Sequence, residues 1–187
     1  GDLKWLSLPT HLADSAEVAF LLWRRWVPEG VKRKIADGIM LGNEEIAEKL
    51  IVFLAAAHDI GKATPVFASK ECGYRELDER IFEQIVEADL PLEPQNFYIY
   101  RGKTPHALAS QVLLRHAGCP VSAAVVLGAH HGKPPDLRTL EMNMENYPEN
   151  YYVDSAGRTA WQEVQHELIK FALVRSGFKS ITELPEI

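Results

Sequence analysis

The sequence has few cysteines, no long apolar run and no excess of basic residues, and each shortage excludes a class of protein. Cys72 and Cys119 are the only cysteines and lie far apart, so neither a disulfide framework nor a zinc knuckle is indicated. We therefore expect a reducing compartment, the cytoplasm. The longest apolar runs, 50–57 and 121–129, are much shorter than the roughly 20 residues of a membrane helix, and the chain does not open on a signal-peptide pattern. We expect no membrane partner.

The shortage of positive charge limits how the protein could hold nucleic acid. The formal net charge is −6 and the sequence pI is about 5.7. Because phosphate neutralisation supplies most of the affinity for nucleic acid, a broad basic binding surface is excluded. Any nucleic acid must be held locally or by a partner. The 187 residues fit one domain, 1–187, with room for a sizeable core.

A predicted helix over residues 44–57 ends in His58, Asp59, Gly61 and Lys62. Asn43 can cap it, and its apolar residues recur at helical spacing, so the helix is expected to be buried. A buried carboxylate costs several kcal/mol unless it meets a cation or hydrogen-bond donors. One interpretation is a plain helix end, with the histidine meeting the helix dipole and the glycine terminating the helix. The other interpretation is a metal site.

Four more histidines lie at or near the ends of predicted helices, which favours the metal site. Thr10 is predicted to cap a helix that His11 opens, and Thr104-Pro105 is predicted to start a helix that His106 opens. The nearly all-apolar helix 121–131 ends in His130 and His131. Two adjacent histidines need two partners, and helical neighbours point about 100° apart, so both reach one ion only if the helix unwinds there. An all-helical domain builds a pocket where such helix ends converge.

The remaining segments carry weaker signals. Segment 74–90 predicts a helix that is acidic outside, with Leu77, Ile81 and Ile85 as its buried stripe, and 159–174 predicts the last helix. Segment 133–157 has no clear period and is expected to be a large loop, or a mobile flap.

Two short segments leave a nucleic-acid contact open. The aromatic residues 97–100, beside Arg101 and Lys103, fit either a strand-like segment packed on the core or a platform for stacked bases. The basic run 32–34 is read as a solvated helix face or loop, with only a weak hint of phosphate contact. His116 and His166 lack the setting of the other histidines and are read as ordinary helix residues.

Imidazoles combined with a carboxylate indicate which ions would bind. Manganese, iron, cobalt or nickel suit such ligands better than magnesium, which prefers oxygen ligands. Asp59 could bridge two ions, and a bridged pair generates hydroxide near neutral pH and clamps phosphoryl oxygens during in-line attack. Lys62 could then bind a phosphate oxygen. This chemistry predicts phosphodiester hydrolysis with up to two ions in each chain.

The pattern resembles the HD phosphohydrolase superfamily, and more narrowly the HD nuclease domain of the CRISPR-associated type I helicase-nuclease. The resemblance extends over nearly the whole chain and is carried by four strings in the family's order: Thr10-His11-Leu12-Ala13-Asp14, His58-Asp59-Ile60-Gly61-Lys62, Pro105-His106-Ala107 and Ala129-His130-His131-Gly132. The adjacent histidines before glycine point to this branch in particular. The implied fold is all-α, an HD-domain helical bundle with a metal pocket at converging helix ends.

The resemblance also implies ligands, an activity and partners. One ion would be held by His11, His58 and Asp59, and the other by Asp59, His106, His130 and His131. The implied activity is metal-dependent cutting of single-stranded DNA in CRISPR type I interference. A superfamily 2 helicase, fused or separate, would feed the strand, and a crRNA-guided surveillance complex would recruit it. The helicase would supply the basic channel that this acidic domain lacks.

Two other functions remain open for this fold, and the sequence differs from the family's pattern at its end. Other proteins with the same scaffold hydrolyse nucleotides and cyclic nucleotides, so this chain could be a small-molecule phosphohydrolase. It could also keep the fold without turnover and serve as a non-catalytic binding module. Family members carry a further aspartate in a final helix, after a segment similar to residues 180–185, whereas this sequence stops at Ile187. We therefore expect the last helix of the domain to be missing and the first ion to lack one anionic ligand. The chain is expected to hold one ion or none and to cut DNA poorly.

Overall fold

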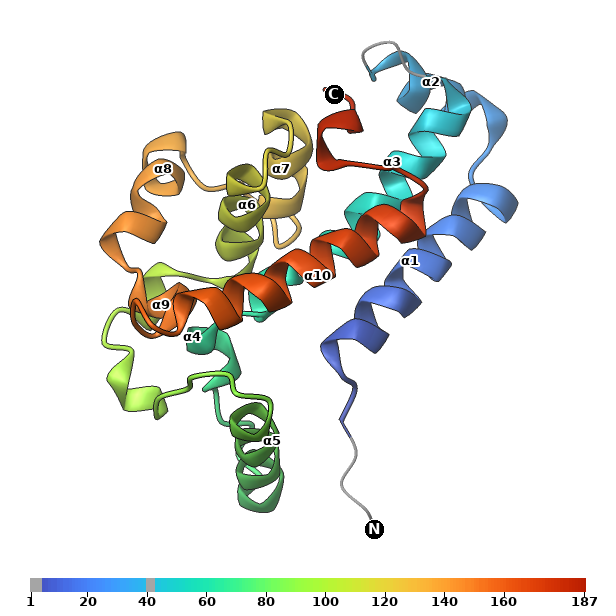
Figure 1. Cartoon of the computed structure of the whole chain (residues 1–187). Helices are drawn as coiled ribbons and strands as arrows, with labels where there is room; N and C mark the ends of the chain where they lie inside the picture. Colours follow the sequence, from blue (N-terminus) through green and yellow to red (C-terminus); the bar gives the residue numbers. More distant parts are fainter. Residues whose placement is uncertain (1–4, 40–42) are drawn as a thin grey trace.

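A computed structural model describes residues 5–39 and 43–187, and every regular element in that part of the chain is helical. The expected all-α class is therefore confirmed (Figure 1). The elements in order are α1 (Leu8–Arg25), α2 (Glu29–Asp37), α3 (Glu44–Ala57), η1 (Ile60–Lys62), α4 (Pro65–Ala68), α5 (Arg75–Glu87), η2 (Gln95–Phe97), η3 (Arg101–Lys103), α6 (His106–His116), α7 (Val121–Gly128), α8 (Leu137–Asn146), α9 (Glu149–Tyr152), α10 (Arg158–Ser176) and η4 (Ile181–Glu183).

Helix α3 is the centre of the core. Helices α1 and α10 pack along it, and α6 and α7 form a second pair that meets α3 and η1 (Figure 1). Leu12, Phe53 and Ala172, one from each of α1, α3 and α10, are completely buried in the same apolar cluster. The predicted burial of the central helix is thus confirmed, and its carboxyl end with η1 lies against α6.

The predicted helix starts are partly right. Asn43 caps α3, as expected, by accepting a hydrogen bond from the backbone N–H of Ile46 at 2.9 Å. Thr10 does not cap α1, because Ser7 does so one turn earlier and Pro9 is tolerated in the first turn. Thr104 does not cap α6 either, since its hydroxyl is buried and bonds to Asn143 instead.

The prediction of a large loop over 133–157 was wrong. Asp136 caps α8 by accepting from the N–H of Thr139 at 2.9 Å, and α9 follows. Asn143 and Asn150 are buried, and both bond to the hydroxyl of Thr104, which accepts from the Asn150 amide and donates to the Asn143 carbonyl oxygen. Because this buried face is held by amide hydrogen bonds as well as by apolar packing, it carries little hydrophobic periodicity.

Segments 74–90 and 91–103 also differ from expectation. Helix α5 forms, but Leu77, Ile81 and Ile85 are only half-buried, since α5 projects from the body of the molecule (Figure 1). Residues 95–103 form two 3₁₀ turns, η2 and η3, and not a strand-like segment. Of the aromatic residues there, Tyr98 is buried at 1 % exposure, whereas Tyr100 is 54 % exposed.

Two further findings bear on the sequence predictions. The described helices include none that is long and apolar enough to cross a membrane. In the basic run 32–34, Lys32 lies in α2 with its ammonium 2.6 Å from Glu29, and only Arg33 and Lys34 are exposed. Lys32 is therefore a poor candidate for a phosphate contact.

Candidate metal centre

Asp59 lies at the point where the candidate site residues meet. It follows the C-cap residue of α3, His58, and precedes η1, and its side chain is only 5 % exposed. Its Oδ2 faces one set of side chains and its Oδ1 faces another. A carboxylate with its two oxygens presented to two nitrogen clusters has the arrangement of a bridging ligand.

The first cluster, which we call group one, consists of His11, His58 and Asp59. The Nε2 atoms of His11 and His58 lie 2.9 Å and 3.1 Å from Asp59 Oδ2, and 3.3 Å from each other. Lys62 reaches the same oxygen, with its Nζ 2.7 Å away. The carboxylate of group one therefore has a lysine ammonium beside it.

The second cluster, group two, consists of His106, His130 and His131. Helix α7 ends at Gly128 and not at residue 131 as predicted, so His130 and His131 lie in the turn after it. This is the unwinding that lets two adjacent histidines face one ion. The Nε2 atoms of His106 and His131 are 2.8 Å apart, and those of His106 and His130 lie 3.3 Å and 3.4 Å from Asp59 Oδ1. Three imidazole nitrogens converge here beside a buried carboxylate oxygen.

Backbone carbonyls fix how two of the histidines present their rings. His58 Nδ1 lies 2.8 Å from the carbonyl of Ala55, and His130 Nδ1 lies 2.6 Å from that of Leu127. A carbonyl only accepts, so each Nδ1 carries the proton and donates it, which leaves the Nε2 lone pair facing Asp59. Metal-ligating histidines commonly donate their other ring N–H in this way, which fixes the tautomer and the orientation of the ring.

The pKa shifts differ between the two groups. Burial alone would raise the pKa of the Asp59 carboxyl, but hydrogen bonds and charges from His58 and Lys62 hold it well below its ordinary value. The hydrogen bond to Asp59 raises the pKa of His58, against the effect of burial. Burial lowers the pKa of His106 to about 4 and also lowers that of His130. Burial thus favours the uncharged form of His106 and His130.

Ser110 of α6 ties the two groups together. Its hydroxyl donates to the carbonyl of His58 at 2.8 Å and accepts from the N–H of Gly61 at 2.9 Å, with the side chain fully buried. Gly61 permits this contact, because a Cβ there would lie 2.0 Å from the carbonyl of His106. The sequence reasoning missed Ser110; the signal it offered is a small polar residue one turn after His106 on an otherwise apolar helix.

The residues present fit metal ions. In each group the candidate ligand atoms lie within 4.8 Å of one another. Within the described part of the chain, the buried atoms Asp59 Oδ1 and His130 Nε2 have no hydrogen-bond partner, which is costly unless an ion or water takes their lone pairs. All six predicted ligands are thus brought together, with Lys62 beside them. His116 and His166 belong to neither group, as expected.

The comparisons with known proteins agree with this geometry. The family model described as "Cas3, HD domain" matches residues 1–187. The CRISPR-associated nuclease/helicase Cas3 of Streptococcus thermophilus is 36% identical over 194 residues, covering 99% of this chain and 21% of that protein. The chain therefore spans about a fifth of the length of this relative.

Solved structures show the same fold. A crystal structure of a CRISPR-associated protein has 25% identity and a TM-score of 0.75, covering 98% of this chain and 19% of its own. The Thermus thermophilus Cas3 HD domain, crystallised in the presence of Ni²⁺, has 22% identity and a TM-score of 0.57, covering 95% of this chain and 65% of its own.

Proposed function

This chain belongs to the Cas3 HD-domain family, and from that premise we propose that it is a metal-dependent nuclease that cuts single-stranded DNA in CRISPR type I interference. The observation that carries the proposal is Asp59, whose two oxygens face groups one and two separately. We propose the cytoplasm as the location, in keeping with the free cysteines Cys72 and Cys119.

The proposed ligands follow the two groups. His11, His58 and Asp59 would hold one ion, and Asp59 with His106, His130 and His131 the other. The nitrogen-rich donor set suits manganese, iron, cobalt or nickel better than magnesium. When bound, such ions supply a hydroxide nucleophile near neutral pH and positive charge at the phosphoryl oxygens.

The chain's own residues would position the substrate and the ligands. Asp59 stays ionised because its pKa is depressed, so it is ready as a ligand without first losing a proton. Lys62 is 29 % exposed at its side chain, which lets its ammonium bind a phosphate oxygen of the scissile group. Ser110 holds the turn that carries His58 and Asp59 against α6, and so keeps the two groups in register.

The proposed partners follow from the family. The Streptococcus relative is a nuclease/helicase, and we propose that a superfamily 2 helicase, fused or separate, feeds the strand to this domain. A crRNA-guided surveillance complex would recruit the pair. The net charge of −6 supports a division of labour in which the helicase holds the strand and this domain cuts it, because an acidic domain lacks a broad basic surface of its own.

The test compares substrates and metals on one preparation. The protein is freed of metal with a chelator, supplied with manganese or with magnesium, and given single-stranded DNA, duplex DNA and a cyclic dinucleotide. We expect manganese-dependent cutting of single-stranded DNA above the other two substrates, and its loss in Asp59→Ala. Faster turnover of the cyclic dinucleotide would instead make this a small-molecule phosphohydrolase, and metal binding with no turnover would make it a binding module.

A further inference from the structure

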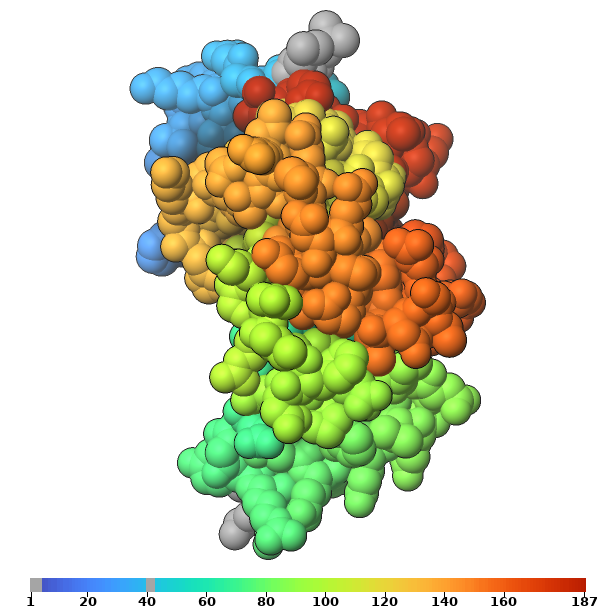
Figure 2. All heavy atoms as spheres, turned by 90° about the vertical axis from the view of Figure 1, so that its left-hand side faces the viewer, coloured from blue at the N-terminus to red at the C-terminus, as the bar shows by residue number. Residues whose placement is uncertain are grey.

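A groove of about 380 Å³ lies between η3 and α8, away from groups one and two. Lys103 borders it from η3, and Arg138, Asn143 and Asn146 border it from α8, with Tyr147 at the end of that helix. In Figure 2 the orange α8 region and the yellow-green segment around residue 100 lie on the same face of the molecule. Nothing in the proposed metal chemistry uses this groove.

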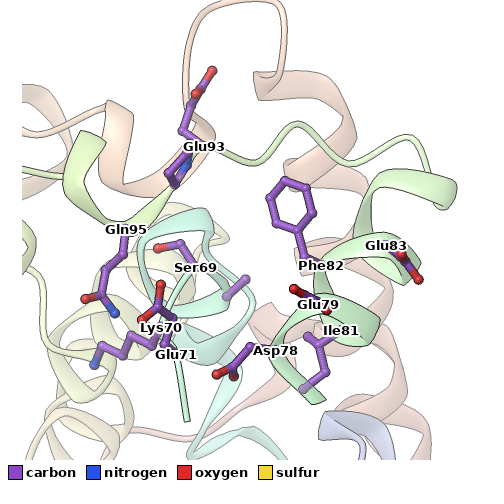
Figure 3. A pocket seen from close by; sticks show the side chains of 12 residues that line it. Ser69, Lys70, Glu71, Asp78, Glu79, Ile81, Phe82, Glu83, Glu93 and Gln95 are labelled. Atoms are coloured by element: carbon purple, nitrogen blue, oxygen red, sulfur yellow. The ribbon is translucent and has the colours of Figure 1, made fainter. Parts of the chain in front are cut away.

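The groove is a local concentration of positive charge on an acidic protein. Neither Lys103 nor Arg138 forms an ion pair with another described residue, and no carboxylate borders the groove. The pocket beside α5 is the opposite case, since several carboxylates, among them Glu71, Asp78 and Glu79, outnumber the single lysine, Lys70, in its lining (Figure 3). A phosphate-bearing strand would therefore favour the first and be repelled by the second.

Half-buried Tyr147 borders the groove, and the ring of Tyr100 lies against the Tyr147 ring. The rings of Tyr100 and Tyr147 have centroids 5.5 Å apart, and Tyr100 is 54 % exposed. Exposed aromatic rings next to lysine or arginine are how proteins hold single strands, because bases stack on the rings while the cations meet the phosphates. Duplex DNA keeps its bases stacked inside and gains nothing from such rings.

The groove is connected to the metal centre by a short segment of chain and by two hydrogen bonds. Thr104, between Lys103 and the α6 residue His106, donates a hydrogen bond to Asn143 at 3.1 Å, and Asn143 in turn donates to the carbonyl of Lys103 at 2.9 Å. Three residues of extended chain span at most about 11 Å, so Lys103 lies within that distance of the group-two ligand His106, Cα to Cα. A strand leaving the groove would need to travel only a short way to the centre.

We propose that the groove between η3 and α8 binds the single strand next to the cleavage point, with Lys103 and Arg138 on phosphates and Tyr100 and Tyr147 on bases. The proposal rests on the proposed nuclease function and adds to it a substrate subsite within this chain. It also explains how an acidic domain could orient a strand that a helicase delivers.

The first test removes the two charges and keeps the fold. The variant Lys103→Gln with Arg138→Gln is compared with Arg33→Gln and Lys34→Gln, which removes the same charge from exposed positions of α2. Binding of a labelled oligothymidylate is followed by fluorescence anisotropy with a chelator present to prevent cutting. The groove variant should bind about tenfold or more weakly than the α2 variant. Its slope of log affinity against log salt should fall by about 1.4, since each single-strand phosphate contact contributes about 0.7.

The second test separates the groove from the metal centre. Tyr100→Leu keeps an apolar side chain but removes the ring, and should weaken oligothymidylate binding about fivefold or more. Both groove variants should hydrolyse bis(p-nitrophenyl) phosphate with manganese as the unaltered chain does, because that small diester needs only the metal centre. Equal strand affinity in the groove and α2 variants, or loss of the small-diester activity, would overturn the groove proposal alone. Turnover of a cyclic dinucleotide in preference to single-stranded DNA by the unaltered chain would instead refute the proposed function.

Discussion

The two groups on either side of Asp59 have similar ligands but different electrostatic surroundings. Group one has Lys62 on the shared carboxylate and a histidine, His58, whose pKa is raised. Group two has His106 and His130, whose pKa values are lowered by burial, and no lysine on its side of the carboxylate. A cation entering group one must displace the Lys62 ammonium from Asp59 Oδ2, whereas burial favours the uncharged, ligating form of His106 and His130 in group two. We infer that group two binds its ion more tightly.

The largest effect is expected where the two groups meet. Asp59→Ala removes a ligand from both ions, so cutting should fall by more than about 100-fold, since even an outer-shell partner of a metal ligand is worth 10–100-fold. The fold should survive, because the apolar face of α3 is untouched. Cleavage assays and a thermal melt check this, with His116→Ala as the control. Equal loss in both variants would mean that the cluster does not act as a site.

Removing one ligand from each group separates the two sites. Calorimetric titration with manganese should show that His130→Ala loses the tighter site, while His11→Ala loses the weaker one and keeps the tighter. Each variant is the other's control, since each removes one imidazole near Asp59. The inferred order of affinity would be wrong if His11→Ala abolished the tighter binding.

Ser110 tests whether the groups depend on a shared support. Ser110→Ala leaves the N–H of Gly61 without its acceptor, which should lower the free energy of unfolding by about 1–3 kcal/mol. It should also weaken manganese binding at both sites by about tenfold, because the lost hydroxyl orients the turn that carries the ligands His58 and Asp59. Ser176→Ala is the matched control, because that buried hydroxyl bonds only within α10, to the carbonyl of Leu173. A stability loss with unchanged metal affinity would limit Ser110 to a structural role.

Acid should release the two ions in order. As pH falls, His58 takes up its proton first, because its pKa is raised, and a protonated imidazole cannot bind a metal. His106, with a pKa of about 4, stays neutral over most of the same range. A manganese release curve followed by electron paramagnetic resonance should therefore show group one emptying at higher pH than group two. A single step, or the reverse order, would contradict the contrast between the groups.

The candidate metal ligands could be predicted from the sequence, but the residue that holds them in place, Ser110, could not. His58 and Asp59 follow a periodic apolar helix, and His130 and His131 are adjacent before a glycine, so their positions at helix ends, together with the family resemblance, marked them as candidates. The roles of the ligands remain predictions, although the structure brings them together. The buried hydroxyl of Ser110 could not be placed, because what it contacts lies about 50 residues earlier in the chain.

The loop predicted for 133–157 failed for a related reason. Helices α8 and α9 are held partly by Asn143 and Asn150, whose amides bond across the chain to Thr104. Hydrophobic periodicity detects apolar faces, and this face is partly polar. Because α8 was not predicted, the groove beside it was not predicted either, since Lys103 and Arg138 come together only once that helix forms.

The central claim is that Asp59 bridges two ions that differ in affinity. Crystals grown without metal and soaked in rising manganese concentrations would show each ion by its anomalous scattering. The first peak should appear among His106, His130, His131 and Asp59 Oδ1, and the second, at higher concentration, among His11, His58 and Asp59 Oδ2. The two peaks should be about 4 Å apart, the spacing of a bridged pair. Peaks away from Asp59, or group one filling first, would contradict this account.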